Sequence, residues 1–425
     1  MRQIFRGGVF RLFFMGFNFG VGLLIAALAG PATFGILSLM IVNAAVIHII
    51  IGFGTDAALV YHGSDDQFNK HKSFSIAFFT GMVQVALFLV LAAAYYTISG
   101  KLVLSGKQGN GFFFIEFLYF TGIVFTEKYT SLFYARHQQS FCNKVLSIVA
   151  AVFFLMLVSL YFFDPPGHIK PIVFFCSMIT IQSLVLAIAF HGKNRVGFSS
   201  LNRNDLRSFL HFSFLVFVTN AIQFLAYRVD FWFIGYFGQI SDIGIYAQAV
   251  RLAQLLWIIP NILAAVLIPA IVAAQKGFDA LGLVRLIRVL NIVNLIILVG
   301  LIGVSCTLYF YFIPDYASGL PSLLLMLPGY LSFSITLLLA AFFSAKRRLL
   351  VNFYGSLLCF LVIITADFLL IPRWGIQGAA VSNTIAYGLA TIFNIFMFSR
   401  IAGIPVKNLF MVRTSDIQQL KKIQY

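Results

Sequence analysis

Hydrophobic residues along this chain gather in long runs, and short polar stretches rich in glycine, proline and aspartate separate the runs. A helix that crosses a bilayer needs about 20 mostly apolar residues, and a window of roughly that length finds twelve runs that qualify. The predicted membrane-spanning helices cover residues 9–29, 34–60, 74–98, 111–134, 145–163, 171–191, 209–236, 244–273, 289–313, 319–345, 351–371 and 378–399. The pattern therefore predicts an all-α integral membrane protein with twelve transmembrane helices.

Arg2, Arg6 and Arg11 precede the uncharged part of the first run, which ends at Ala27-Leu28-Ala29 and so resembles a cleavable signal peptide. Its length of about 18 residues exceeds the usual apolar core of such a peptide. Cleavage would also leave eleven spans and spoil the internal repeat described below. We therefore expect this run to remain as the first spanning helix.

Composition agrees with a membrane protein. Of the 425 residues, 61% are hydrophobic and 10% are charged, whereas a soluble domain has about 45–50% and 25%. Mean hydropathy is +0.96. The four cysteines show neither CxxC nor Cys/His spacing, which predicts no disulfide framework and no metal site. The chain also lacks a Walker A loop and the spacings of a catalytic triad, so we predict neither an enzyme nor a cofactor.

The formal charge of +16 arises from 29 Lys and Arg residues against 13 Asp and Glu residues. When the basic residues are sorted by predicted segment, 22 lie on the side of the two termini, four on the opposite side and three inside spans. Cytoplasmic loops of membrane proteins carry an excess of Lys and Arg. The bias predicts that both termini are cytoplasmic, and it accounts for the charge without a nucleic-acid partner.

Three short motifs recur at an offset of 208 to 210 residues, each at the same place in the predicted topology. The matched positions are Gly35 with Gly244, Arg136 with Lys346, and Gly167 with Gly375. Because six spans return the chain to its starting side, a duplication of six spans gives parallel repeats. We expect an N-terminal six-helix lobe at 1–195, a basic cytoplasmic linker at 196–208, a C-terminal six-helix lobe at 209–400 and a basic cytoplasmic tail at 401–425.

Ionisable residues inside apolar helices are costly and are candidates for function. Arg228 lies about 13 Å from the predicted outer end of its span, near the middle of a core of about 30 Å. Arg251 lies at similar depth in the next span, and Lys128 lies well inside the fourth. We interpret these three cations as the lining of a polar cavity for an anionic substrate, because guanidinium groups suit phosphate oxygens. The alternative is that they form interhelical ion pairs that fix the bundle.

Four further titratable residues are candidates for coupling transport to an ion, or for ion pairing within the bundle. They are Asp230, Glu127, His48 and Asp56. Asp230 cannot simply neutralise Arg228, because residues two apart project from different sides of a helix. For His48 and Asp56 a structural role is favoured, since a histidine in a span is often an interhelical hydrogen-bond donor and Asp56 lies near a span end.

Helix breakers inside two of the spans predict bends. Pro260 interrupts the span at 244–273, and Pro328-Gly329 interrupts the span at 319–345. Proline removes a backbone donor and frees a carbonyl, which allows a helix to bend. These residues are candidate hinges, with a static kink as the alternative.

Four regions of the chain carry motifs in a characteristic order. They are Gly30-Pro31-Ala32-Thr33-Phe34-Gly35, then Gly52-Phe53-Gly54-Thr55-Asp56, then Tyr227-Arg228-Val229-Asp230 with Ile243-Gly244-Ile245-Tyr246 and Ala249-Val250-Arg251, and finally Pro372-Arg373-Trp374-Gly375-Ile376-Gln377-Gly378-Ala379-Ala380. Over nearly the whole chain this order resembles the polysaccharide flippases of the multidrug/oligosaccharidyl-lipid/polysaccharide exporter superfamily, although each motif is degenerate. The resemblance implies two six-helix lobes around a cationic cavity. The three candidate cations correspond to that cavity by depth and sign, without a fixed signature.

The resemblance further implies a flippase that moves undecaprenyl-pyrophosphate-linked oligosaccharide repeat units, for O-antigen or capsule, across the bacterial cytoplasmic (inner) membrane by alternating access. The expected partners are membrane lipid, the lipid-linked glycan, and a glycan polymerase with its chain-length regulator. Two alternatives stay open. A cation-coupled multidrug exporter of the same superfamily would favour acidic residues at the midplane, and a membrane glycan polymerase would carry a large extracytoplasmic loop.

Overall fold

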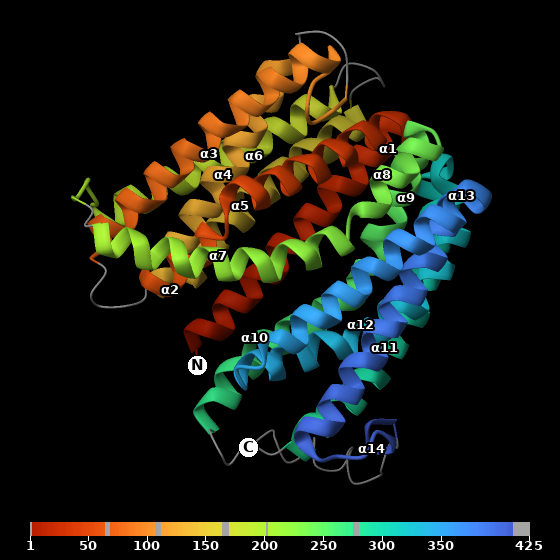
Figure 1. Cartoon of the computed structure of the whole chain (residues 1–425). Helices are drawn as coiled ribbons and strands as arrows, with labels where there is room; N and C mark the ends of the chain where they lie inside the picture. Colours follow the sequence, from red (N-terminus) through yellow and green to blue (C-terminus); the bar gives the residue numbers. More distant parts are fainter. Residues whose placement is uncertain are drawn as a thin grey trace. The chain divides into compact units, whose positions relative to one another are not determined.

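The computed structural model describes residues 2–63, 69–106, 112–163, 170–200, 203–274 and 280–410. Every regular element in these ranges is a helix (Figure 1). The chain divides into two compact units, Met1–Ala221 and Ile222–Tyr425. Residues 201–202 of the predicted linker and residues 411–425 of the predicted tail lie outside the described part of the chain.

The first unit is built from long apolar helices. They are α1 (Arg2–Gly52), α2 (Thr55–Gly63), α3 (Lys70–Ser99), α4 (Phe113–Ala135), α5 (Gln139–Phe163), α6 (Pro171–Asn194) and the first part of α7 (Arg203–Ala226). Buried side chains of six of these helices, α2 to α7, form one core, which includes Leu59, Phe74, Phe133, Phe190 and Phe209. The start of α7 therefore packs against the helices of the first unit.

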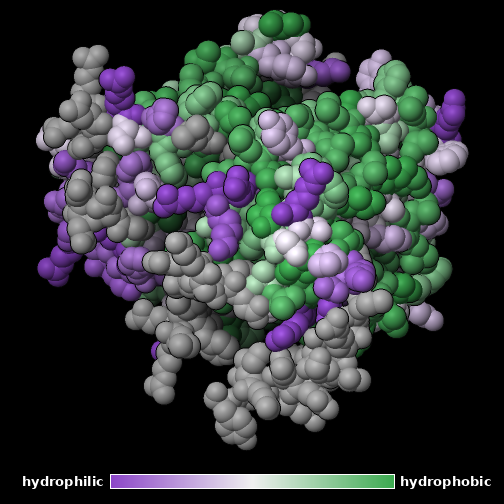
Figure 2. Space-filling model, turned by 60° about the horizontal axis from the view of Figure 1, so that its bottom comes forward, coloured by the Kyte–Doolittle hydropathy of each residue, from purple (hydrophilic) through white to green (hydrophobic). Residues whose placement is uncertain are grey.

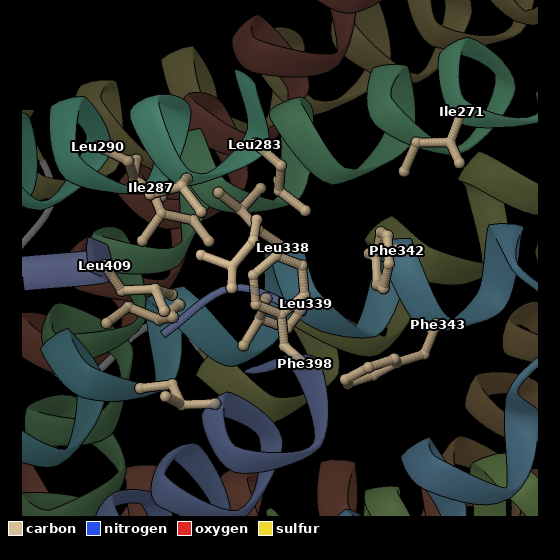
Figure 3. Close-up of a cluster of buried hydrophobic side chains, with 14 of the residues drawn as sticks. Ile271, Leu283, Ile287, Leu290, Leu338, Leu339, Phe342, Phe343, Phe398 and Leu409 are labelled. Carbon is tan, nitrogen blue, oxygen red and sulfur yellow. The ribbon is translucent and has the colours of Figure 1, made fainter. Parts of the chain in front are cut away.

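The second unit continues with helices that are interrupted more often. They are α8 (Val229–Phe237), α9 (Ile240–Ala253), the 3-10 turn η2 (Gln254–Trp257), α10 (Ile258–Ala274), α11 (Ala280–Thr307), the π-helical turn η4 (Leu308–Phe312), the 3-10 turn η5 (Pro314–Gly319), α12 (Leu320–Ala345), α13 (Leu349–Ala402) and α14 (Lys407–Phe410). Figure 3 shows the core of this unit, where Leu283 and Ile287 of α11 meet Leu338 and Phe342 of α12 and Phe398 of α13.

Two helices are long enough to hold two predicted spans each. α1 has 51 residues and α13 has 54, so each is about 80 Å long at 1.5 Å per residue, against a core of about 30 Å. Each contains one glycine with non-helical backbone angles, Gly30 (φ 69°, ψ 167°) and Gly375 (φ 54°, ψ −134°). Both helices turn back near these points (Figure 1), where the sequence predicted connections between spans.

Within the described residues, nine helices are long and apolar enough to cross a membrane by length and composition. α4 is not among them, and it carries three charged residues, Glu116, Glu127 and Lys128. The exposed surface is also apolar. Figure 2 shows broad hydrophobic areas with hydrophilic residues gathered in patches, and side chains such as Ile188 (73% exposed) and Val299 (71%) face outward. A multi-pass membrane protein explains this surface, because lipid covers it without cost.

Candidate functional site

The break between α1 and α2 positions the first polar cluster. Phe53 and Gly54 have positive φ values of 51° and 73°, and α2 starts at the next residue, Thr55. A Cβ on Gly54 would lie 2.3 Å from the backbone oxygen of Ser213 in α7, so only glycine fits this close approach. The hydroxyl of Thr55 donates to the carbonyl of Gly52 at 2.7 Å, which satisfies a backbone acceptor that the break leaves open.

Three of the predicted site residues meet next to this break, where Lys128 and His48 both contact Asp56. The Nζ of Lys128, on α4, lies 2.8 Å from Oδ1 of Asp56 and donates to Oγ1 of Thr55 at 2.6 Å. Nε2 of His48 lies 3.1 Å from the other oxygen of Asp56, and Gln84 of α3 donates to Thr55 at 3.0 Å. The side chain of Lys128 is 1% exposed. In this conformation its ammonium group faces a carboxylate.

Glu127 precedes Lys128 but points elsewhere. Its side chain is exposed, whereas Lys128 is buried. The Glu127 carboxylate lies within electrostatic reach of Asp56, His48 and Arg11. The first unit therefore pairs the buried ammonium of Lys128 with the partly buried carboxylate of Asp56, and the exposed Glu127 carboxylate lies beside them.

A second break, in the seventh predicted span, positions Arg228. α7 ends at Ala226 and α8 begins at Val229, and Arg228 caps α8 with a φ of −137°. The sequence predicted one uninterrupted helix over 209–236, and the turn at residues 227–228 corrects this expectation. The Arg228 guanidinium lies over the ring of Phe231, with Cζ 5.6 Å from the ring centroid. The side chain is half-buried.

Asp230 lies in the first turn of α8 and is 2% exposed. The hydroxyl of Tyr246, on α9, donates to its Oδ2. Nδ2 of Asn383, on α13, donates to the same oxygen at 3.1 Å and to the Tyr246 hydroxyl at 2.6 Å. The Phe231 amide donates to Oδ1 at 2.9 Å. Other helices thus satisfy this carboxylate, as the spacing of Asp230 and Arg228 requires.

Arg251 and Asp367 extend this second cluster. Arg251, on α9, is half-buried and lies within electrostatic reach of Arg228. Asp367, on α13, is 0% exposed and lies within electrostatic reach of Asp230. The Ser382 side chain, also on α13, lies within hydrogen-bonding reach of the Asp367 carboxyl group. The second unit therefore brings two guanidinium groups and two carboxylates to one region.

Sequence reasoning missed Tyr246 and Asn383 as members of this cluster. Tyr246 lies in the Ile243-Gly244-Ile245-Tyr246 motif, so the available signal was a tyrosine hydroxyl group within an otherwise apolar motif. Asn383 carried no such signal, because it is 153 residues from Asp230 and only helix packing joins them.

The predicted hinge residues have different surroundings. Pro260 lies near the start of α10, after the 3-10 turn η2. Pro328 lies inside α12, which continues through it. A Cβ on Gly329 would lie 2.5 Å from Cα of Thr384, and the Thr384 hydroxyl donates to the carbonyl of Leu325 at 2.6 Å. Gly329 therefore lets α13 approach α12 closely, and hinge motion at these residues stays a prediction.

Comparison with known proteins places this chain in a family. The polysaccharide biosynthesis protein family matches residues 4–275 of the chain. No curated protein matches the chain at a significant level. Among solved structures, the lipid II flippase MurJ in an inward closed conformation has a TM-score of 0.76 at 14% identity, covering 98% of this chain and 92% of that chain.

Transporters of the multidrug resistance MATE family have the same fold. An inward-facing member of the MOP superfamily has a TM-score of 0.65 at 12% identity, covering 95% of this chain and 98% of that chain. A mutant of the Vibrio cholerae MATE transporter VcmN has a TM-score of 0.61 at 12% identity, covering 96% of this chain and 98% of that chain. At these identities the structures establish the fold, and the family match covers more than half of the sequence. The chain is a member of the polysaccharide biosynthesis protein family and has the fold of the MOP exporters.

Proposed function

We propose that this protein is a flippase for undecaprenyl-pyrophosphate-linked oligosaccharide repeat units, used for O-antigen or capsule, in the bacterial inner membrane. Family membership supports a role in polysaccharide biosynthesis, and the fold is shared with a lipid II flippase. The observation that carries the proposal is the pair Arg228 and Arg251. The two guanidinium groups lie within electrostatic reach of each other in apolar helices, so an anion that binds beside both of them lowers their mutual repulsion.

The diphosphate of a polyprenyl-linked sugar fits this pair. Guanidinium groups bind phosphate oxygens through two parallel hydrogen bonds, and they lose less hydration on burial than an ammonium group does. The polyprenyl tail stays in lipid while the headgroup and glycan cross in a polar environment. This avoids moving a charged headgroup through hydrocarbon, which would cost many kcal/mol.

We propose Asp230 as a coupling residue. It is buried with polar partners, and Asp367 lies within electrostatic reach. Charge on one of these carboxylates disfavours charge on the other, and Arg228 is a cation within electrostatic reach of Asp230. Uptake and release of a proton or a cation here can bias the lobes between inward-open and outward-open states. Lys128 and Asp56 then serve as a structural ion pair, with Glu127 as the accessible carboxylate of the first unit.

We also propose twelve spans with both termini in the cytoplasm. α1 and α13 each supply two spans that turn at Gly30 and Gly375, and α4 supplies a span in spite of its charges. The cytoplasmic side then carries most of the basic residues. A glycan polymerase and a chain-length regulator are the proposed partners, because they act on the glycan after it has crossed.

Substitution of the two arginines tests the proposal. Arg228→Ala and Arg251→Ala should each reduce surface glycan at least about tenfold, the effect of losing roughly 1.4 kcal/mol of headgroup binding. Lysine at either position should restore only part of the surface glycan, since lysine lacks the planar guanidinium group. Surface glycan is measured beside the abundance of the protein in the membrane.

Arg400→Ala is the matched control, because the Arg400 guanidinium also lies over a ring, that of Phe396, 4.6 Å from the centroid, but in the last turn of α13. It should leave surface glycan unchanged. Normal glycan at normal abundance in both the Arg228 and the Arg251 variants would remove the pair from the mechanism.

A cation-coupled multidrug exporter is the second candidate, and the buried pair Asp230 and Asp367 favours it. Export of a cationic dye from cells that carry the protein separates the two functions. Dye export that Asp230→Asn abolishes, together with glycan that does not depend on the arginines, would favour the exporter.

A further inference from the structure

The ring of Phe231 lies beneath the proposed headgroup cation. Arg228 caps α8, and Phe231 follows three residues later in the first turn, so the two side chains lie on the same face of the helix. Cζ of Arg228 is 5.6 Å from the ring centroid, within the range of a cation–π interaction. Phe231 is 1% exposed. The ring is therefore fixed by packing, whereas the guanidinium above it is half-buried.

Tyr246 also packs against this ring. The rings of Phe231 and Tyr246 meet edge to face, with centroids 5.5 Å apart and an interplanar angle of 69°. Tyr246 is 0% exposed. Its hydroxyl donates a hydrogen bond to Asp230 and accepts one from Asn383. A chain of contacts therefore runs from the Asp230 carboxylate through two rings to the Arg228 guanidinium. Asp230 also lies within electrostatic reach of Arg228, so the two rings add a path of packed contacts to a direct charge interaction.

We propose that Phe231 and Tyr246 are positioning residues. Their ring pair orients the Arg228 guanidinium toward the diphosphate and ties that orientation to the charge state of Asp230. This inference rests on the proposed function, since it presumes an anionic headgroup at Arg228. It names the residues through which substrate binding and the coupling carboxylate affect each other.

Equilibrium binding of inorganic pyrophosphate to the full chain in detergent micelles tests the positioning of Arg228. Phe231→Leu removes the ring and should weaken binding about tenfold. Phe231→Tyr keeps the ring and should restore most of the affinity. In an Arg228→Ala background, Phe231→Leu should change the Kd by less than about twofold, because the cation that the ring orients is already gone.

The control is Phe233→Leu, which removes a ring from the same helix that stacks on Phe237 and should leave the Kd unchanged. Additive effects of the Phe231 and Arg228 substitutions, or equal weakening by Phe233→Leu, would overturn the positioning role while the headgroup site stands. If Arg228→Ala leaves the Kd unchanged, or the unaltered protein fails to bind pyrophosphate, the proposed headgroup site itself fails.

Tyr246→Phe tests the tie to Asp230, because it keeps the ring and removes the hydroxyl that reaches the carboxylate. Asp230→Asn should change pyrophosphate affinity in two ways: by removing a negative charge, and by altering the contacts that run through Tyr246 and Phe231 to Arg228. In the Tyr246→Phe background only the direct effect of charge remains, so the change in Kd caused by Asp230→Asn should shrink at least about threefold. An equal change in both backgrounds would disprove the tie.

Discussion

Lys128 and Arg228 are both cations inside apolar helices, but their surroundings differ. The ammonium of Lys128 lies 2.8 Å from Asp56 and is almost fully buried, whereas Arg228 rests on an aromatic ring and stays half-buried. An ammonium group buried as deeply as that of Lys128 needs a carboxylate partner, because its desolvation costs several kcal/mol. The flat guanidinium gains from the ring face, and the half-buried side chain stays partly accessible.

The buried ion pair makes a prediction for stability. Lys128→Met keeps the length of the side chain and leaves the Asp56 carboxylate without its closest cation. Because the Asp56 side chain is 24% exposed and keeps His48 at 3.1 Å, we expect the free energy of unfolding to fall by about 2 kcal/mol, less than when both partners are fully buried. The thermal midpoint of the purified protein in detergent measures this loss.

The double substitution Lys128→Met with Asp56→Asn is the control. It removes both charges and should recover a large part of the loss, since no uncompensated charge stays buried. A double variant less stable than Lys128→Met alone would contradict this account of the pair.

At the scale of elements, the candidate residues cluster where helices are interrupted. Asp56 follows the break between α1 and α2, and Arg228 occupies the break between α7 and α8. Breaks inside membrane helices expose backbone groups, which are tolerated only where protein or water satisfies them. The Thr55 hydroxyl does so at the first break. Polar side chains therefore lie at the interruptions, and apolar helical segments continue on either side of them.

Gly54 allows a prediction about the first break. Alanine there would combine a positive φ with a Cβ only 2.3 Å from the Ser213 carbonyl. We expect Gly54→Ala to cost about 2–4 kcal/mol, from backbone strain and from displacement of α7 together. Gly300→Ala is the matched control, because Gly300 lies within α11 and a Cβ there would meet nothing within 4 Å.

Thermal midpoints in detergent distinguish the two glycines. The Gly300 variant should match or slightly exceed the unaltered protein, since alanine is the better helix former. A Gly54 variant as stable as the Gly300 variant would show that α7 does not require the close approach.

At the scale of the whole molecule, the chain divides into two compact units, and the duplication expected from the repeats stays a prediction. The boundary after Ala221 falls within α7, which begins in the core of the first unit at Phe209. The connection between units is thus a continuous helix. Lipid favours this, because a loop inside the bilayer would leave backbone groups unsatisfied.

The twelve-span topology predicts where the turns at Gly30 and Gly375 lie. Cysteines at Ala32 and Trp374, in a background without Cys306, should react with a membrane-impermeant thiol reagent added outside spheroplasts. A cysteine at His137, in the turn between α4 and α5, should react only after permeabilisation. If α1 and α13 each crossed the membrane once, positions 32 and 374 would lie in lipid and stay unlabelled.

The sequence alone determined the helical class, the places of the apolar segments and the turns at Gly30-Pro31 and Gly375. It also identified Arg228, Asp230 and Lys128 as residues that need partners. These follow from residue type and spacing along one helix, because hydropathy and the requirements of a buried charge are local properties. The break at residues 227–228 escaped the same reasoning, since every residue there is compatible with a helix.

Only the tertiary structure decided which partners those residues have. It paired Lys128 with Asp56 and joined Asp230 to Tyr246 and Asn383 across 16 and 153 positions. Nearly every helix in this chain is apolar on all sides, so periodicity gives little information about which faces meet. The packing of helices, which depends on small residues such as Gly54 and on the fit of neighbouring side chains, selects the pairs.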